Sequence, residues 1–194
     1  MKSLIQVASE LQDFFIRRSW RFCFIGGLAL QRWGQPRLTI DVDISLLTGF
    51  GQEKKYIDEL LIYFTPRIVD ADDFARKNRV LLLKSESGVG IDIALAGLPF
   101  EEEVIERASE FEYLPGIKLR ICSAEDLVIL KAFADRSQDW ADVESIVERQ
   151  SKNLDRNYIV KHLKPLSALK DAPWIMSHLE KMFNSKNESG DENG

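Results

Sequence analysis

Two aspartates separated by a single residue, Asp41 and Asp43, lie inside the apolar segment 38–47. Apolar residues there alternate with Thr39, the two aspartates and Ser45, a pattern that predicts a strand with one polar and one buried face. Residues two apart in a strand point to the same side, so both carboxylates point one way. Like charges so close repel each other unless a cation lies between them. A divalent metal would satisfy the pair, and two solvent-facing carboxylates at a strand edge are the alternative interpretation.

Length and composition suit one compact domain or a core with an appended helical part. The chain has 194 residues, of which 45% are hydrophobic, enough for a real core. The net charge of −5 argues against a broad nucleic-acid-coating surface, although the local basic cluster Arg67, Arg76, Lys77 and Arg79 could serve an RNA. No apolar run approaches the roughly 20 residues of a membrane span, and the first residues lack a signal-peptide core. We therefore expect a cytoplasmic protein with no membrane partner.

The expected organisation is an α/β core over residues 1–122, a helical part over 123–183 and a disordered polar tail over 184–194. Prolines 165 and 173 are expected to interrupt the last helices. Leu38 and Ile40 are expected on the buried face of the strand. The expected strands are 21–25, 38–47, 80–84, 91–95, 111–114 and 117–122, and the expected helices before residue 122 are 3–17, 28–33, 52–64 and 100–109.

A glycine pair, Gly26-Gly27, stands where a short apolar strand meets a helix. Without side chains, the backbone N–H groups can approach phosphate oxygens, with a helix N-terminus behind them. A purely structural turn is the alternative. Arg37 and Thr39, just before Asp41, are either phosphate contacts or ordinary turn and strand residues.

A third carboxylate, Asp92, lies between Ile91 and Ile93 in the second strand of an expected hairpin. A carboxylate in an apolar strand is costly to bury unless it is paired or bound to metal. If this strand lies beside segment 38–47, Asp92 completes a set of three carboxylates, which with a triphosphate makes a two-metal site plausible. Pairing with an arginine such as Arg79 is the alternative. The glycines at 88 and 90 are interpreted as part of the hairpin turn.

A lysine, Lys131, lies on an otherwise apolar helix expected to begin near Ser123. It either forms a surface ion pair with Asp135, four residues further on, or neutralises triphosphate charge during phosphoryl transfer. Asp139 and Asp142 follow, and they either cap the next helix or orient the lysine and an arginine.

Other catalytic motifs are missing from the sequence. There is neither a P-loop nor a dinucleotide-binding Gly-x-Gly-x-x-Gly motif. The two histidines, His162 and His178, both fall in the C-terminal helices, which argues against a histidine triad or a zinc site.

In combination these residues resemble the DNA polymerase β-like nucleotidyltransferase superfamily, and more narrowly its AbiEii-type and minimal members. The resemblance covers about residues 22–147. Many members carry Gly-Ser where this chain has Gly26-Gly27. The matching motifs are Gly26-Gly27, Arg37-x-Thr39-x-Asp41-x-Asp43, Ile91-Asp92-Ile93, Ser123-x-Glu125-Asp126-Leu127 with Lys131, and Arg136-x-x-Asp139-x-x-Asp142.

The resemblance implies an α+β fold, with a mixed-sheet nucleotidyltransferase core flanked by helices and a helical C-terminal part. It implies that Asp41, Asp43 and Asp92 bind two Mg²⁺ (or Mn²⁺) ions, and that Asp92 helps to activate the attacking hydroxyl. The nucleotide would be bound by Gly26, Gly27, Arg37, Thr39 and Lys131, with Asp139 or Asp142 supporting the lysine.

The activity implied is transfer of a nucleoside monophosphate from a nucleoside triphosphate to an acceptor hydroxyl, with release of pyrophosphate. The acceptor would be a small molecule, a tRNA or a protein, and a cognate antitoxin is a further expected partner. A non-catalytic nucleotide-binding or regulatory module of the same fold is the alternative function, and a metal-dependent nuclease is a third.

Overall fold

A computed structural model describes residues 2–188, and by its internal contacts the chain divides into two compact units. The first unit comprises the chain up to Ala29 together with Leu38–Ser123, and the second comprises Leu30–Arg37 together with the chain from Ala124 onward. Segment 30–37, which the sequence places in the α/β core, has its contacts with the helical unit.

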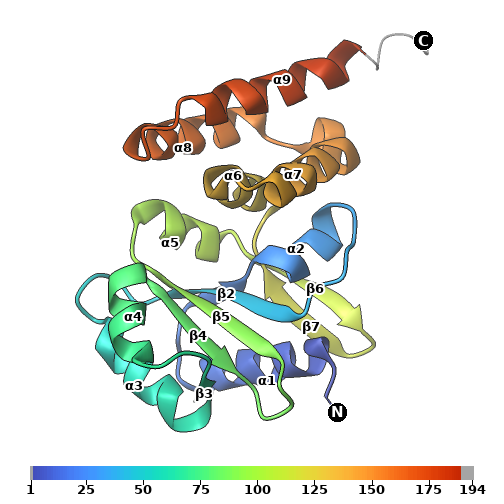
Figure 1. The fold of residues 1–194 in the computed structure, drawn as a ribbon. Coiled ribbons are helices and arrows are strands. Elements are labelled where there is room, and N and C mark those ends of the chain that lie inside the picture. Colours follow the sequence, from blue (N-terminus) through green and yellow to red (C-terminus); the bar gives the residue numbers. More distant parts are fainter. Residues whose placement is uncertain (1, 189–194) are drawn as a thin grey trace. The chain divides into compact units, whose positions relative to one another are not determined.

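The first unit is built on a mixed sheet whose strands, among the described residues, follow the order β3-β4-β5-β2-β1-β7-β6 (Figure 1). Neighbours β2 and β5, and β1 and β7, run parallel, and the other neighbouring pairs are antiparallel. The sheet confirms the mixed architecture expected from the sequence. Its strands are β1 (Phe22–Phe24), β2 (Asp41–Leu47), β3 (Thr65–Pro66), β4 (Val80–Lys84), β5 (Gly90–Ala96), β6 (Ser109–Leu114) and β7 (Ile117–Ile121).

Helices cover both faces of this sheet. Figure 1 shows α1 (Leu4–Arg17) and α5 (Pro99–Glu106) on opposite sides of it, where α1 contacts β7 and β2 and α5 contacts β2 and β1. A capping box at Ser3 starts α1, because its hydroxyl accepts a hydrogen bond from the Gln6 backbone. Two further helices, α3 (Glu53–Tyr63) and α4 (Ala71–Asn78), pack against each other, and α4 contacts β4. The sequence did not predict α4, whose buried residues are only two alanines.

Strand β2 carries its core on one face, as the alternation predicts. Val42, Ile44 and Leu46 are fully buried. The expectation for Leu38 and Ile40 was wrong: their exposed fractions are 87% and 70%, because β2 begins only at Asp41 and the chain before it is irregular. The polar face is therefore shorter than expected and starts with the first aspartate.

The second unit packs helices around α6 (Ala124–Ala134), which contacts α7 (Ser137–Gln150), α8 (Arg156–Leu169) and α9 (Trp174–Glu188). A short 3₁₀ turn, η1 (Ser151–Asn153), follows α7. Helix α6 is apolar nearly all round, typical of a central helix. Pro165 lies inside α8 and does not interrupt it, contrary to expectation. The tail expected from residue 184 begins within α9, and residues 189–194 lie outside the described residues.

One helix, α2 (Gly26–Trp33), has residues in both units, because it begins in the first and ends in the second. It starts at Gly26, so the glycine pair forms its first turn, whereas the sequence placed the pair just before a helix from 28. This start brings the backbone of the two glycines next to the polar face of β2.

Candidate functional site

The three aspartates come together in the first unit because β2 and β5 are parallel neighbours. In their register Asp43 lies directly opposite Asp92, and Asp41 lies opposite Gly90. Adjacent strands are about 4.8 Å apart, and paired residues point to the same face. The condition set by the sequence, that the strand of Asp92 lies beside segment 38–47, is therefore met.

An arginine whose proximity to these carboxylates the sequence does not predict lies among them. The guanidinium of Arg67 donates a hydrogen bond to Asp92 through Nη2, and its Nη1 lies 3.6 Å from Oδ1 of Asp41. The suggested partner of Asp92, Arg79, instead forms an ion pair with Glu53 at 2.5 Å. Arg67 thus bridges the two strands, and the arginine that pairs with Asp92 is Arg67 rather than Arg79, the example given for the alternative interpretation.

Gly90 leaves the space in which Asp41 and Arg67 meet. A Cβ atom on Gly90 would lie 1.8 Å from Oδ1 of Asp41 and 3.1 Å from Nη1 of Arg67. The sequence predicts a hairpin turn at this glycine, but it is the first residue of β5. Any side chain here would push the Asp41 carboxylate out of its position.

The glycine pair holds the remaining aspartate. Gly26 has a φ of +57°, and a Cβ on it would lie 2.0 Å from Oδ2 of Asp43. The same oxygen accepts a hydrogen bond from the Gly27 N–H at 3.2 Å. A Cβ on Gly27 would lie 2.4 Å from the Thr39 hydroxyl oxygen. Both glycines therefore allow the start of α2 to close onto Asp43 and Thr39, and the helix N-terminus favours the negative charge there.

Asp92 has a perturbed acidity. Burial raises its pKa above the ordinary value for an aspartate, the nearby carboxylates of Asp43 and Asp41 raise it further, and the Arg67 guanidinium opposes both effects. A raised pKa makes a carboxylate a better proton acceptor, the property that a general base requires.

The donor chemistry of the cluster suits a hard divalent cation. Mg²⁺ prefers oxygen ligands and is usually held by one or two carboxylates together with phosphate oxygens and water. Asp41 and Asp43 supply such a pair on one face of β2. Within residues 2–188, no group of three or more carboxylate, histidine or cysteine side chains has an arrangement ready to hold a metal ion. In this structure Arg67 contacts Asp41 and Asp92, and the Gly27 N–H contacts Asp43.

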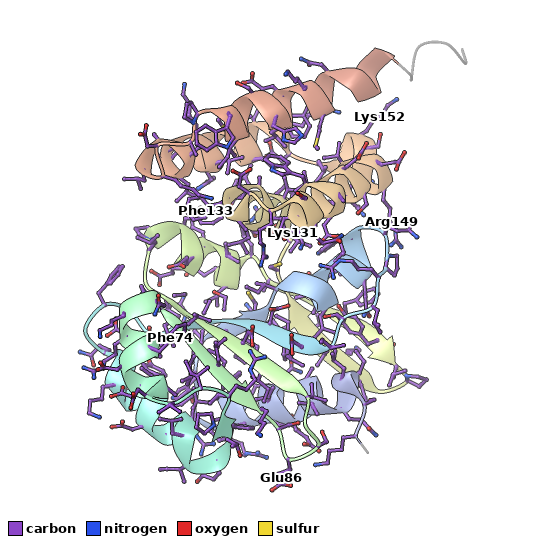
Figure 2. All side chains as sticks on the ribbon, in the orientation of Figure 1. Phe74, Glu86, Lys131, Phe133, Arg149 and Lys152 are labelled. Carbon is purple, nitrogen blue, oxygen red and sulfur yellow. The ribbon has the colours of Figure 1, made fainter. Side chains whose placement is uncertain are left out.

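A second charged cluster lies inside the helical unit. Lys131, labelled on α6 in Figure 2, has its Nζ 2.6 Å from Oδ2 of Asp142 and 3.2 Å from Oδ1 of Asp139. All three side chains are buried. The alternative considered for Lys131, a surface ion pair with Asp135, is wrong, because Asp135 accepts hydrogen bonds from the indole N–H groups of Trp140 and Trp174.

Two arginines complete the second cluster. Arg37 donates from Nε and Nη2 to both oxygens of Asp142, and Arg136 pairs with Asp139. Burial alone would raise the pKa of Asp142, but the hydrogen bonds from Arg37 and Lys131 hold it below the usual range. Asp139 and Asp142 therefore orient the lysine and the arginines, which is one of the two roles considered for them from the sequence.

The basic cluster suggested for RNA does not present free positive charge. Arg76 forms ion pairs with Asp72 and Asp73, and Lys77 pairs with Asp73 as well. These pairs lie on α4, where the acidic residues offset the basic ones.

None of the described helices is long and apolar enough to cross a membrane.

The fold of the chain is that of nucleotidyltransferases. A nucleotidyltransferase-like antigenic protein from Paracoccidioides brasiliensis has a TM-score of 0.51 at 16% identity, covering 91% of this chain and 92% of its own. The antibiotic-resistance factor ANT(2'')-Ia, solved in solution, has a TM-score of 0.54 at 13% identity, with coverages of 91% and 97%. Its crystal structure with adenylyl-2''-tobramycin gives 0.54 at 12% identity, with coverages of 87% and 99%. These identities establish the fold alone.

The family follows from the sequence itself. Residues 17–188 match the family described as nucleotidyl transferase AbiEii toxin of type IV toxin–antitoxin systems. The match covers most of the chain, so the protein belongs to the AbiEii nucleotidyltransferase family. No curated protein matches it.

Proposed function

We propose that this protein is a metal-dependent nucleotidyltransferase that moves a nucleoside monophosphate from a nucleoside triphosphate to an acceptor hydroxyl. The observation that carries the proposal is the register of β2 and β5, which sets Asp43 beside Asp92 and extends the acidic face to Asp41. Such a set of carboxylates, next to the N-terminus of a glycine-started helix, supports binding of metal and phosphate together.

In the proposed reaction the acceptor oxygen forms a bond to the α-phosphorus of the nucleotide. The bond from that phosphorus to the bridging oxygen of the β-phosphate breaks, and pyrophosphate leaves. Asp92 takes the proton of the acceptor hydroxyl, a role supported by its raised pKa. Asp41 and Asp43 hold the divalent cation, which when bound supplies positive charge for the phosphate oxygens.

Positions around the carboxylates have supporting roles. Gly26 and Gly27 keep Asp43 against the first turn of α2, and Thr39 packs on Gly27. We assign both glycines, Arg37 and Thr39 to nucleotide binding on the strength of the sequence motif.

We also assign Lys131 to triphosphate binding on the strength of the sequence motif. Asp139 and Asp142 orient its ammonium group. A measurable consequence is weaker nucleotide binding in Lys131→Arg, which keeps the charge but changes the shape of the donor.

The acceptor class is open to direct screening. ANT(2'')-Ia is described with an adenylylated tobramycin, so aminoglycosides belong in the screen together with tRNA and proteins. The family description also makes a cognate antitoxin an expected partner. Co-expression of such a partner should relieve any growth arrest caused by this protein.

Label transfer tests the proposed reaction. Each α-³²P-labelled nucleoside triphosphate is incubated with the protein, Mg²⁺ and one acceptor pool, and a parallel reaction contains γ-labelled nucleotide. The α label should move to an acceptor, while the γ label should leave in pyrophosphate. Asp43→Asn should abolish the transfer, and the exposed Asp13→Asn serves as the matched control. Metal-dependent nucleotide binding without transfer to any pool would instead favour the non-catalytic module.

A further inference from the structure

The strand pairing of the sheet positions Arg67 next to the carboxylate cluster. The register places Asp43 opposite Asp92 and Asp92 opposite Leu82. The backbone N–H of Arg67 donates to the carbonyl of Leu82 at 3.0 Å, directly after strand β3. The four residues therefore form a row across the sheet, and an arginine side chain is long enough to reach over one strand to Asp92.

The site also has a space shaped for the guanidinium. The missing side chain of Gly90 leaves room for Nη1 of Arg67 beside Oδ1 of Asp41. About 30% of the Arg67 side chain is exposed, and its guanidinium contacts carboxylates on both parallel strands. Two independent features, the backbone hydrogen bond and the glycine gap, thus fix the same contact.

We propose that Arg67 takes the place of one metal ion in the carboxylate cluster, so that this protein binds a single divalent cation. The inference rests on the proposed function. Asp41, Asp43 and Asp92 carry a formal charge of −3 when ionised, and the guanidinium reduces it to −2. One divalent cation balances what remains.

The same arrangement gives the carboxylates of the cluster different roles. Arg67 holds Asp92 and one oxygen of Asp41, which leaves the pair Asp41 and Asp43 on β2 for the metal. Arginine is permanently charged, so it keeps this position at any working pH. A guanidinium is also a donor of fixed geometry, which suits it to orient Asp92 toward the acceptor proton.

Counting bound Mn²⁺ tests the proposal without any turnover. Equilibrium dialysis against Mn²⁺ alone, with electron paramagnetic resonance to detect coupled ion pairs, is applied to the wild type, Arg67→Gln and Arg67→Lys. The control is Arg76→Gln, which removes the same charge from α4, where Arg76 contacts Asp72 and Asp73. Melting curves confirm that each variant is folded.

The expected result is one Mn²⁺ per chain in the wild type, Arg67→Lys and Arg76→Gln, and two in Arg67→Gln with a coupled spectrum. Two ions in the wild type would overturn the role of Arg67 and leave the proposed function intact. This result would hold even if the Arg67 variants did not fold, because it is measured on the wild type. One ion in both the wild type and folded Arg67→Gln would also overturn it. No bound Mn²⁺ in any protein would also overturn the role of Arg67, and the label-transfer assay, which contains nucleotide, would then test the proposed function separately.

Discussion

Gly90→Ala should damage activity without damaging the fold. The new Cβ would lie 1.8 Å from Oδ1 of Asp41, and an ordinary contact needs 3.4 Å, so the oxygen must retreat by about 1.6 Å. The displaced atom is the end of a side chain, so the backbone of the sheet can stay in place. A misplacement of about 1 Å in a catalytic group costs on the order of 100-fold in rate, or about 2.7 kcal/mol of activation free energy.

Although its activity should fall, the stability of Gly90→Ala should stay equal to that of the wild type or rise. Gly90 has no left-handed φ, and replacing glycine by alanine within a strand stabilises by about 0.5–1 kcal/mol. We therefore expect label transfer to fall about 100-fold, while the free energy of unfolding in urea stays equal or rises.

The matched control is Gly88→Ala, in the β4–β5 hairpin near Glu86, which Figure 2 labels. Gly88 has a φ of +87°, and a Cβ on it would meet no atom within 4 Å, so alanine there should lose about 1–2 kcal/mol of stability and keep full activity. Full activity in Gly90→Ala, or loss of its fold, would refute the positioning role of this glycine.

Three further predictions concern the helical unit. Lys131→Met leaves Asp139 and Asp142 buried with fewer partners, so urea unfolding should show a loss of about 3–5 kcal/mol; an unchanged midpoint would contradict this. Because the pKa of Asp142 is lowered in the folded state, its contribution to stability should be present above its unfolded pKa, about 3.9, and lost as the pH falls through the folded value. Asp142→Asn should remove that part of the acid dependence, which unfolding curves between pH 2 and 7 would show. Tyr158→Phe removes a 2.9 Å hydrogen bond to fully buried Asp126 and should cost about 1–3 kcal/mol, measured by thermal unfolding; a cost near zero would show that other donors satisfy this carboxylate.

The strand with its two aspartates could be predicted from the sequence because the information is local. Alternation along segment 38–47 is enough to place Asp41 and Asp43 on one face. The same rule failed for Leu38 and Ile40, since it cannot locate where hydrogen bonding to a neighbour begins. Strand β2 starts at Asp41 because its pairing with β5 starts there, opposite Gly90.

The partners of the charged residues could not be predicted, because they depend on contacts between distant segments. Arg67 follows a two-residue strand that has no hydrophobic pattern, and it reaches Asp92 only through the register of β3, β4 and β5. Arg37 and Asp142 are separated by 105 positions in the sequence. Gly90 offered one usable signal: it directly precedes segment 91–95, the strand expected from the sequence to carry Asp92, and a glycine at such a position can leave space for a neighbouring side chain as well as form a turn.

Calorimetry of nucleotide binding is the most direct test of the proposed active site. Each nucleoside triphosphate is titrated into the wild type and into the double variant Asp41→Asn/Asp43→Asn, with Mg²⁺ and with a chelator. We expect one triphosphate to bind the wild type only when Mg²⁺ is present, and the double variant, folded by its melting curve, to bind none. Binding that is unchanged in the double variant, or absent from the wild type for every triphosphate, would contradict a metal-dependent nucleotide site at these aspartates.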